Sequence, residues 1–201
     1  MAARHLIVVG LDWDAVETME AEGHTIVGVI GPAPPDACGS LTYLGRDEDW
    51  EAIRPEHSDA EVILTVDQPR LRSRLLTRYG EAVATFVSAG ATVSHRARIG
   101  AGSFIQTEAR VQALVETGSC CKLNIGAMVH HECVLGDYVT VAPRAVLLGN
   151  VTVGAGSYIG AGAVIRQRIR IGERATIGAG AVVVSDVEDD ATVVGVPARR
   201  R

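Results

Sequence analysis

The sequence has few aromatic residues, few cysteines and no long apolar run. Aromatic residues make up 4% of the 201 residues, and the four cysteines form neither a disulfide framework nor a paired zinc motif. The apolar run at residues 6–9 is too short for a signal peptide, and no segment reaches transmembrane length. The net charge of −5 argues against nucleic acid as the main partner. We therefore expect a cytoplasmic protein without membrane insertion.

The remaining composition is that of a folded chain with an unusual glycine content. Hydrophobic residues make up 47% and charged residues 21%, which excludes a disordered or fibrous chain. A length of 201 residues fits one large domain or two small ones. The 22 glycines, combined with so few aromatics, indicate a repetitive β architecture.

A six-residue repeat runs through the second half of the chain. From Val87 to Val183 every sixth residue is aliphatic except Thr117, and a small residue follows four positions after most of them. Glycine recurs every eighteen residues, at Gly100, Gly118, Gly136, Gly154 and Gly172. This spacing predicts a three-sided solenoid with three six-residue units per coil and coils stacked about 4.8 Å apart. Ordinary hairpins with glycine turns rarely hold one register for so long.

The same register places the cysteines. Cys121 and Cys133 fall on the small inward positions, so we expect them to fill the core. Cys120 lies beside that column and Cys38 falls in an expected loop, and neither has a visible reactive setting.

The first half, residues 1–85, is expected to form a small Rossmann-like α/β domain, and residues 86–201 the solenoid. Strands are predicted at residues 5–10, 25–31 and 61–66, and helices at 14–22 and 69–79. A parallel sheet of this kind binds ligands at the carboxyl ends of its strands, here beside Gly10, Leu11 and Asp12. Two carboxylates in this turn would repel a pyrophosphate, and Asp12 or Asp14 is more simply a helix N-cap.

Four motifs in the solenoid carry a family resemblance: HHECVLG at 130–136, LLGNVTVG at 147–154, YIGAGAVI at 158–165 and VVGVPARRR at 193–201. Behind an α/β unit, they resemble the nucleotide-sugar acetyltransferases of the bacillosamine and sialic-acid pathways over nearly the whole chain. The six-residue repeats alone mark only the wider left-handed β-helix superfamily. The resemblance implies a left-handed parallel β-helix, a homotrimer, and acetyl-CoA bound between neighbouring subunits.

The resemblance also implies roles for individual residues. His131 would remove a proton from the acceptor amine or hydroxyl, and Glu132 would orient its imidazole. The amide of Gly149, eighteen residues after His131, would stabilise the oxyanion, and the glycine would leave room for the pantetheine arm.

The amides of Ala161 and Ala179 would hold the pantetheine arm, and Arg199 would contact the CoA phosphates or lie in a solvated tail.

Two departures concern the small-molecule acceptor. Relatives carry a second histidine nine residues after the catalytic one, where this chain has Thr140, and a glycine-rich, histidine-containing turn where this chain has residues 11–14. An amino-sugar nucleotide is therefore one candidate acceptor beside another amine or alcohol, and N- and O-acetylation stay open.

Two rival interpretations are a zinc enzyme and a protein without catalysis. His95 lies thirty-six residues before His131, which resembles two ligands of γ-type carbonic anhydrases, but the third ligand position is Gly136. Catalytic zinc needs three protein ligands, so we expect no metal. A trimeric scaffold or binding protein of the same fold is the non-enzymatic alternative.

Overall fold

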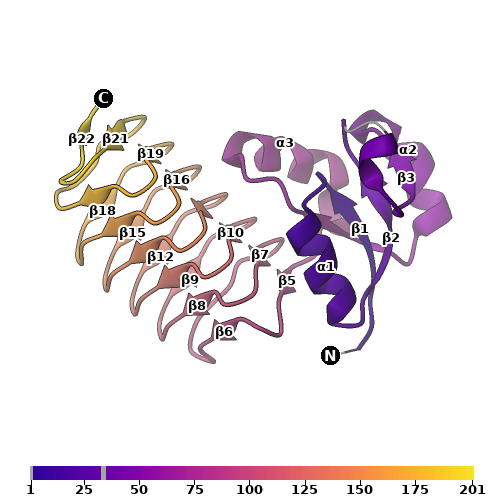
Figure 1. Ribbon diagram of the computed structural model, residues 1–201, viewed down its shortest axis with the longest axis horizontal. Helices are drawn as coiled ribbons and strands as arrows, with labels where there is room; N and C mark the ends of the chain where they lie inside the picture. Colours follow the sequence, from indigo (N-terminus) through magenta and orange to yellow (C-terminus); the bar gives the residue numbers. More distant parts are fainter. Residues whose placement is uncertain (1, 33–34) are drawn as a thin grey trace.

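The computed structural model describes residues 2–32 and 35–201 and shows an α/β unit lying beside the first coils of a triangular solenoid (Figure 1). The α/β unit holds a parallel sheet in the order β3-β2-β1-β4. Its strands and α-helices are β1 (His5–Val9), α1 (Trp13–Ala21), β2 (Thr25–Ile30), β3 (Tyr43–Gly45), α2 (Trp50–Ile53), β4 (Glu61–Leu64) and α3 (Pro69–Tyr79).

The expected helices and strands are present within two residues of their predicted ends, and α3 has the predicted bounds. β3, α2 and several 3-10 turns were not predicted. The expected loop position of Cys38 is wrong, because this residue ends the 3-10 helix Pro35–Cys38 and is buried.

Strand β1 is buried on both faces because helices cover the sheet on both sides. Leu6 and Val8 pack with α1, whose buried side chains include Val16 and Met19. Ile7 and Val9, which point to the opposite face, pack with α2 and α3. This alternation follows the two-residue period of a strand, and the near-continuous apolar sequence of β1 is typical of a parallel sheet covered on both sides.

The solenoid is a left-handed parallel β-helix with three faces. Face 1 contains β5 (Phe86–Val87), β7 (Phe104–Ile105), β10 (Lys122–Leu123), β13 (Thr140–Val141), β16 (Tyr158–Ile159), β19 (Thr176–Ile177), β21 (Thr192–Val194) and β22 (Arg199–Arg200). Face 2 contains β6 (Thr92–Val93), β8 (Arg110–Val111), β11 (Met128–Val129), β14 (Val146–Leu147), β17 (Val164–Ile165) and β20 (Val182–Val183). Face 3 contains β9 (Glu116–Thr117), β12 (Val134–Leu135), β15 (Thr152–Val153) and β18 (Arg170–Ile171).

The strand pairing confirms the predicted register. From β5 to β20 each coil pairs with the next at an offset of eighteen residues, as in Lys122 with Thr140 and Met128 with Val146. The last coil pairs at an offset of sixteen, as in Thr176 with Thr192. The repeated residue is the second residue of each strand from β5 to β20 and is aliphatic in all of them except β9, where it is Thr117. These aliphatic side chains point into the prism, where small residues complete the core. Arg98 forms an isolated bridge to Glu116 in the next coil.

Residues eighteen apart therefore share an edge of the prism. We call the turn from face 1 to face 2 edge 1–2; it carries Ile125, Pro143, Ala161 and Ala179. Edge 2–3, the turn from face 2 to face 3, carries His131 and Gly149. Several turns contain a residue whose backbone is in the left-handed region. In the turn that carries His131, this residue is Glu132, at φ 60°.

Helix α3 is fastened to face 1 by Arg72. Its buried guanidinium donates to the carbonyl oxygens of Cys120 (2.9 Å) and Tyr138 (2.7 Å) and to Thr140 Oγ1 (2.8 Å). Burial lowers the pKa of Arg72 to about 10, so the guanidinium keeps its charge at neutral pH. The α/β unit thus has a buried, charged connection to the β-helix. Within residues 2–32 and 35–201, no helix is both long and apolar enough to span a membrane.

Candidate active site

His131 and Glu132 form a hydrogen-bonded pair on edge 2–3. His131 Nδ1 lies 3.0 Å from Glu132 Oε2, and the two side chains are 54% and 51% exposed. Asn150 Nδ2 donates to the same carboxylate oxygen at 3.4 Å. When Nδ1 carries the ring proton it donates to Glu132, which leaves Nε2 as an acceptor. The pair therefore presents a basic nitrogen at an accessible edge.

Gly149 lies directly over this imidazole. A Cβ atom at Gly149 would come within 2.5 Å of His131 Cε1 and 2.6 Å of Nε2. The ring of His131 therefore takes the space that a side chain at Gly149 would need, and the room for a pantetheine arm stays a prediction. The Gly149 N–H has no hydrogen-bond partner among the residues that the structure describes, and the Gly149 carbonyl accepts from the next coil.

Ala161 and Ala179 lie on edge 1–2, and so on a different edge from His131. Ala161 follows β16 and Ala179 follows β19, whereas His131 follows β11. Both alanines are exposed, and neither amide donates a hydrogen bond within the described part of the chain. One chain therefore does not bring these amides together with His131.

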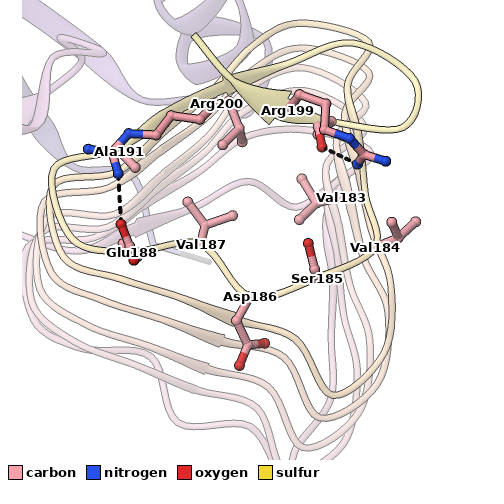
Figure 2. A pocket seen from close by; sticks show the side chains of 11 residues that line it. Val183, Val184, Ser185, Asp186, Val187, Glu188, Ala191, Arg199 and Arg200 are labelled. Carbon is pink, nitrogen blue, oxygen red and sulfur yellow. Dashed lines mark hydrogen bonds and ion pairs between the residues drawn. The ribbon is translucent and has the colours of Figure 1, made fainter.

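Arg199 lies in β22, at the far end of the solenoid. Its guanidinium donates to the carbonyl of Ala198, and its side chain is exposed. Figure 2 shows Arg199 and Arg200 on opposite sides of a hollow of about 640 Å³, with Arg200 directed at Glu188. This hollow is the open end of the prism, lined by core residues such as Val183 and Val187.

A second hollow, of about 430 Å³, lies between the α/β unit and face 1. Gly10, Leu11 and Asp12 line it from the β1–α1 turn, so the three residues predicted from the sequence lie together. We call it the Lys122 hollow. Its remaining lining residues are Asp14, Thr65, Val66, Asp67, Gln106, Lys122, Asn124, Ile125 and Pro143. Because Ile125 and Pro143 belong to edge 1–2, the hollow opens on the edge that carries Ala161 and Ala179.

Lys122 is the residue of this hollow that sequence reasoning missed. Its side chain is 2% exposed, and Nζ lies 3.1 Å from Asp12 Oδ2 and 2.9 Å from Asp67 Oδ1. Asp12 also caps α1, accepting from the amide of Ala15 at 3.2 Å as expected. One sequence signal could have identified it. Lys122 directly precedes the repeated inward residue Leu123, and a lysine that is buried needs partners of opposite charge.

Thr140 has a structural role under helix α3. It is fully buried, accepts from Arg72 Nη2 and donates to the carbonyl of Asp67 at 2.7 Å. The hydroxyl therefore ties face 1 to the loop that precedes α3, beside the Lys122 hollow.

The zinc alternative finds no support in the geometry. Gly136, at the position of the third expected ligand, has no space for a side chain, because a Cβ there would lie 2.7 Å from the amide of Ala155. Within the described ranges, no three His, Cys, Asp or Glu side chains are grouped as metal ligands.

The cysteines near the solenoid core are buried, as expected for Cys121 and Cys133. Burial raises the pKa of Cys120 to about 11 and that of Cys121 to about 12, and it also raises the pKa of Cys133. These thiols therefore stay protonated at neutral pH.

Comparison with known proteins gives consistent matches. Residues 139–167 and 150–185 match the family described as "Bacterial transferase hexapeptide (six repeats)". GDP-perosamine N-acetyltransferase from Escherichia coli O157:H7 is 36% identical over 102 residues, 50% of this chain and 46% of that enzyme, so the match spans about half of this curated relative.

Two solved structures match over nearly the whole length of both chains. The acetyltransferase domain of PglB from Neisseria gonorrhoeae is 30% identical over 98% of this chain and 100% of that domain, with a TM-score of 0.90. PerB from Caulobacter crescentus, in complex with CoA and GDP-perosamine, is 26% identical over 100% of this chain and 98% of that protein, with a TM-score of 0.90. This chain belongs to the hexapeptide-repeat acetyltransferases. The family resemblance drawn from the four sequence motifs is thereby confirmed.

The PglB domain was also solved in complex with acetyl coenzyme A. That structure is 29% identical to this chain, and the match covers 100% of both chains.

Proposed function

We propose that the protein transfers the acetyl group of acetyl-CoA to an amino group of a small amino-sugar acceptor. The observation that carries this proposal is the His131–Glu132 pair, whose Nε2 lies beside Gly149. The Gly149 amide has no hydrogen-bond partner within residues 2–32 and 35–201. The relatives support N- rather than O-acetylation, because their names include GDP-perosamine N-acetyltransferase. They also favour an amino sugar linked to a nucleotide as acceptor.

The proposed chemistry is direct acyl transfer. As the acceptor nitrogen attacks the thioester carbonyl carbon, His131 Nε2 takes its proton, and the resulting imidazolium is stabilised by Glu132. The Gly149 amide donates to the oxyanion of the tetrahedral intermediate. When the carbon–sulfur bond breaks, the imidazolium returns the proton to the CoA thiolate. The products are the acetamide and free CoA.

A homotrimer completes this site. His131 and Gly149 lie on edge 2–3, whereas Ala161 and Ala179, the proposed holders of the pantetheine arm, lie on edge 1–2. A cyclic trimer sets edge 2–3 of one copy against edge 1–2 of its neighbour. The outward side chains of face 2 support such an interface, because Val146, Val164 and Val182 form an apolar column that is only half-buried in one chain.

The first test is thiol release from acetyl-CoA with a panel of amino-sugar nucleotides, including GDP-perosamine. His131→Ala is expected to lower turnover at least 100-fold, the order of magnitude of a lost general base, while CoA binding measured by calorimetry stays nearly intact. His130→Ala is the matched control, since His130 has no proposed role. Unchanged turnover in His131→Ala would remove this mechanism.

A mixing experiment tests the shared site. Ala161→Pro deletes the proposed amide donor, and the equivalent position one coil earlier is already Pro143. Each variant alone, His131→Ala or Ala161→Pro, should be inactive or strongly impaired. Unfolded together and refolded in equal amounts, they should regain about a quarter of wild-type activity, because random cyclic trimers then contain that fraction of intact sites. No recovery would mean that each site lies within one chain.

CoA binding without thiol release for any acceptor would instead indicate the trimeric binding protein considered above. A cytoplasmic location stays a prediction from the sequence.

A further inference from the structure

The two edges that a trimer would bring together carry matching side chains in their early coils. At eighteen-residue steps, edge 2–3 carries an exposed column of Arg96, Leu114 and Glu132. Edge 1–2 carries a column of Glu108, Gly126 and Arg144. Their pairing rests on the proposed function, because it needs the homotrimer and takes His131 as the base.

A hollow of about 350 Å³ runs along the column of edge 1–2. The stem of Arg144 lies over Gly126, because a Cβ there would come within 3.2 Å of Arg144 Cγ. Arg144 is exposed, and its guanidinium has no hydrogen-bond or ionic partner among the described residues. Arg96 and Glu108 are also exposed and form no ion pair within the same ranges. These charges are therefore free to bind groups of another copy.

The carboxylate of Glu132 is held on one side only. His131 Nδ1 and Asn150 Nδ2 both contact Oε2, at 3.0 Å and 3.4 Å. The other oxygen, Oε1, has no partner within residues 2–32 and 35–201, and the side chain is 51% exposed. The terminal torsion of a glutamate is broad, so a carboxylate held in this way can rotate away from the imidazole.

The two columns match in charge at one relative height. At a separation of twelve residues, Arg96 is followed by Glu108, Leu114 by Gly126 and Glu132 by Arg144. Twelve residues are two-thirds of a coil, or about 3.2 Å along the solenoid. Copies related by a cyclic axis parallel to their prisms keep one height difference throughout, so all three pairs can form together. One coil lower or higher, Glu132 would face a glycine, Gly126 or Gly162, and no opposite charges of the two columns would meet.

Leu114 agrees with this register. It is 55% exposed, and its backbone lies in the left-handed region at φ 62°, where a bulky residue is uncommon. At the same relative height it meets Gly126, which has no side chain, and the half-buried Met128 beside it in the hollow. The trimer would thus cover an apolar side chain that one chain leaves in water.

The later coils of edge 1–2 carry glycine where the early coils carry long side chains. Gly162 and Gly180 continue the column, and a Cβ at either position would meet nothing within 4 Å. They adjoin Ala161 and Ala179, beside which the pantetheine arm is proposed to lie. The paired side chains therefore close the early coils of the interface and leave the later coils open.

We propose that Arg144 of the neighbouring copy binds Glu132 and is a positioning residue for the catalytic pair. Its guanidinium donates to Oε1 of Glu132, in a charge-assisted hydrogen bond. The carboxylate then keeps Oε2 on His131 Nδ1, which fixes the ring with Nε2 toward the acceptor. Each active site is incomplete without a side chain from the next copy.

The first experiment measures kinetics and assembly together. Arg144→Ala should lower kcat about tenfold, leave the KM for acetyl-CoA unchanged and still sediment as a trimer. Arg144→Lys should retain most of the activity, because an ammonium can also bind the carboxylate. Arg98→Ala, whose side chain is exposed and pairs with Glu116 away from both edges, is the control and should change nothing. Unchanged kcat in Arg144→Ala, or a loss of kcat explained by loss of the trimer, would overturn the inference.

A mixing experiment shows which copy supplies the arginine. Arg144→Ala and His131→Ala, unfolded together and refolded in equal amounts, should give about a quarter of wild-type activity, because that fraction of sites combines an intact histidine with a neighbour's intact arginine. If Arg144 served the pair in its own chain, only about a twentieth would be expected, since half of the sites would then work at a tenth of the rate. The lower value would overturn the inference.

Cross-linking tests the contact without turnover. Glu132→Cys/Arg144→Cys, treated with a short bismaleimide, should give covalent trimers on a denaturing gel. Arg96→Cys/Arg144→Cys uses the same two edges two coils out of register and should give few. The four native cysteines are buried and do not compete.

The outcomes separate this contact from the proposed function. Absence of linked trimers in a protein that sediments as a trimer, or equal linking in both variants, would overturn the inference. A wild-type protein that is not a trimer would overturn the inference and the homotrimer together. Linked trimers without thiol release for any acceptor would support the contact and refute the proposed function.

Discussion

Gly149 and His131 form a steric pair across two coils, with the glycine Cα facing the imidazole edge so closely that a Cβ would lie 2.5 Å from Cε1. The backbone of Gly149 is not in the left-handed region, so the ring alone excludes a side chain here.

Gly149→Ala is therefore expected to displace the imidazole. The overpacking should lower the free energy of unfolding by about 1–3 kcal/mol and reduce turnover at least tenfold. In the His131→Ala background the clash disappears, so the second substitution should cost less than about 0.5 kcal/mol. Chemical denaturation of the four proteins in this cycle measures both values. Equal costs in the two backgrounds would contradict the steric coupling.

Thr140→Ala should loosen the attachment of α3 to face 1. It removes a hydrogen bond from the buried Arg72 and one to the carbonyl of Asp67, with an expected cost of about 1–3 kcal/mol. Thr176→Ala, on the same face but exposed, is the control and should cost less than about 0.5 kcal/mol. Urea denaturation compares the two, and equal midpoints would show that the buried hydroxyl adds nothing.

Lys122→Met should be among the more destabilising single changes. It leaves the carboxylates of Asp12 and Asp67 facing one another without a cation, at an expected cost of about 3 kcal/mol. Combining it with Asp12→Asn and Asp67→Asn should recover part of that loss, because no charge then stays unpaired. Arg98→Met breaks an exposed pair with Glu116 and should cost less than about 1 kcal/mol. Thermal unfolding of these three variants and of the wild-type protein decides the comparison.

The buried cysteines predict how stability depends on pH. Burial raises the pKa of Cys121 to about 12 and that of Cys120 to about 11, so the folded protein binds protons more tightly than the unfolded chain. Their contribution is complete below the unfolded thiol pKa, near 9, and is lost as pH rises toward 12. Cys121→Ala should therefore flatten the decline of unfolding free energy above pH 9.

A chemical assay checks the same burial. At pH 8, Ellman's reagent should leave Cys120, Cys121 and Cys133 of the folded protein unmodified for hours, and should react with all four cysteines in denaturant. Rapid labelling of the native protein would contradict the placement of these thiols.

The solenoid was predictable because its repeat imposes a strict pattern on the sequence. Every repeated aliphatic residue points into a prism that admits only one large and one small side chain per strand, so the pattern from Val87 to Val183 carries the architecture. In the α/β unit, β3 spans only three half-buried residues, Tyr43–Gly45, too few to show an alternation. The tertiary contacts of the sheet, and not local sequence, determine that strand.

The site was predictable where its parts are related by the repeat. His131 and Glu132 are neighbours, and Gly149 follows by one coil. The separation of His131 and Ala161 is thirty residues, which is not a multiple of eighteen, so the sequence already placed them on different edges. Lys122 and Asp12 are 110 residues apart and belong to different parts of the fold, and no periodicity joins them.

The coil length restricts how this protein can grow or shrink. A deletion or duplication of eighteen residues in the later coils removes or adds one complete coil. The orientation of every other side chain in the solenoid then stays unchanged. Loss of a single residue between His131 and Gly149 rotates all that follows by part of a turn, and inward aliphatic groups then face water. Chains of this kind should therefore differ in length by complete coils of eighteen residues, or by loops that project outward from the solenoid.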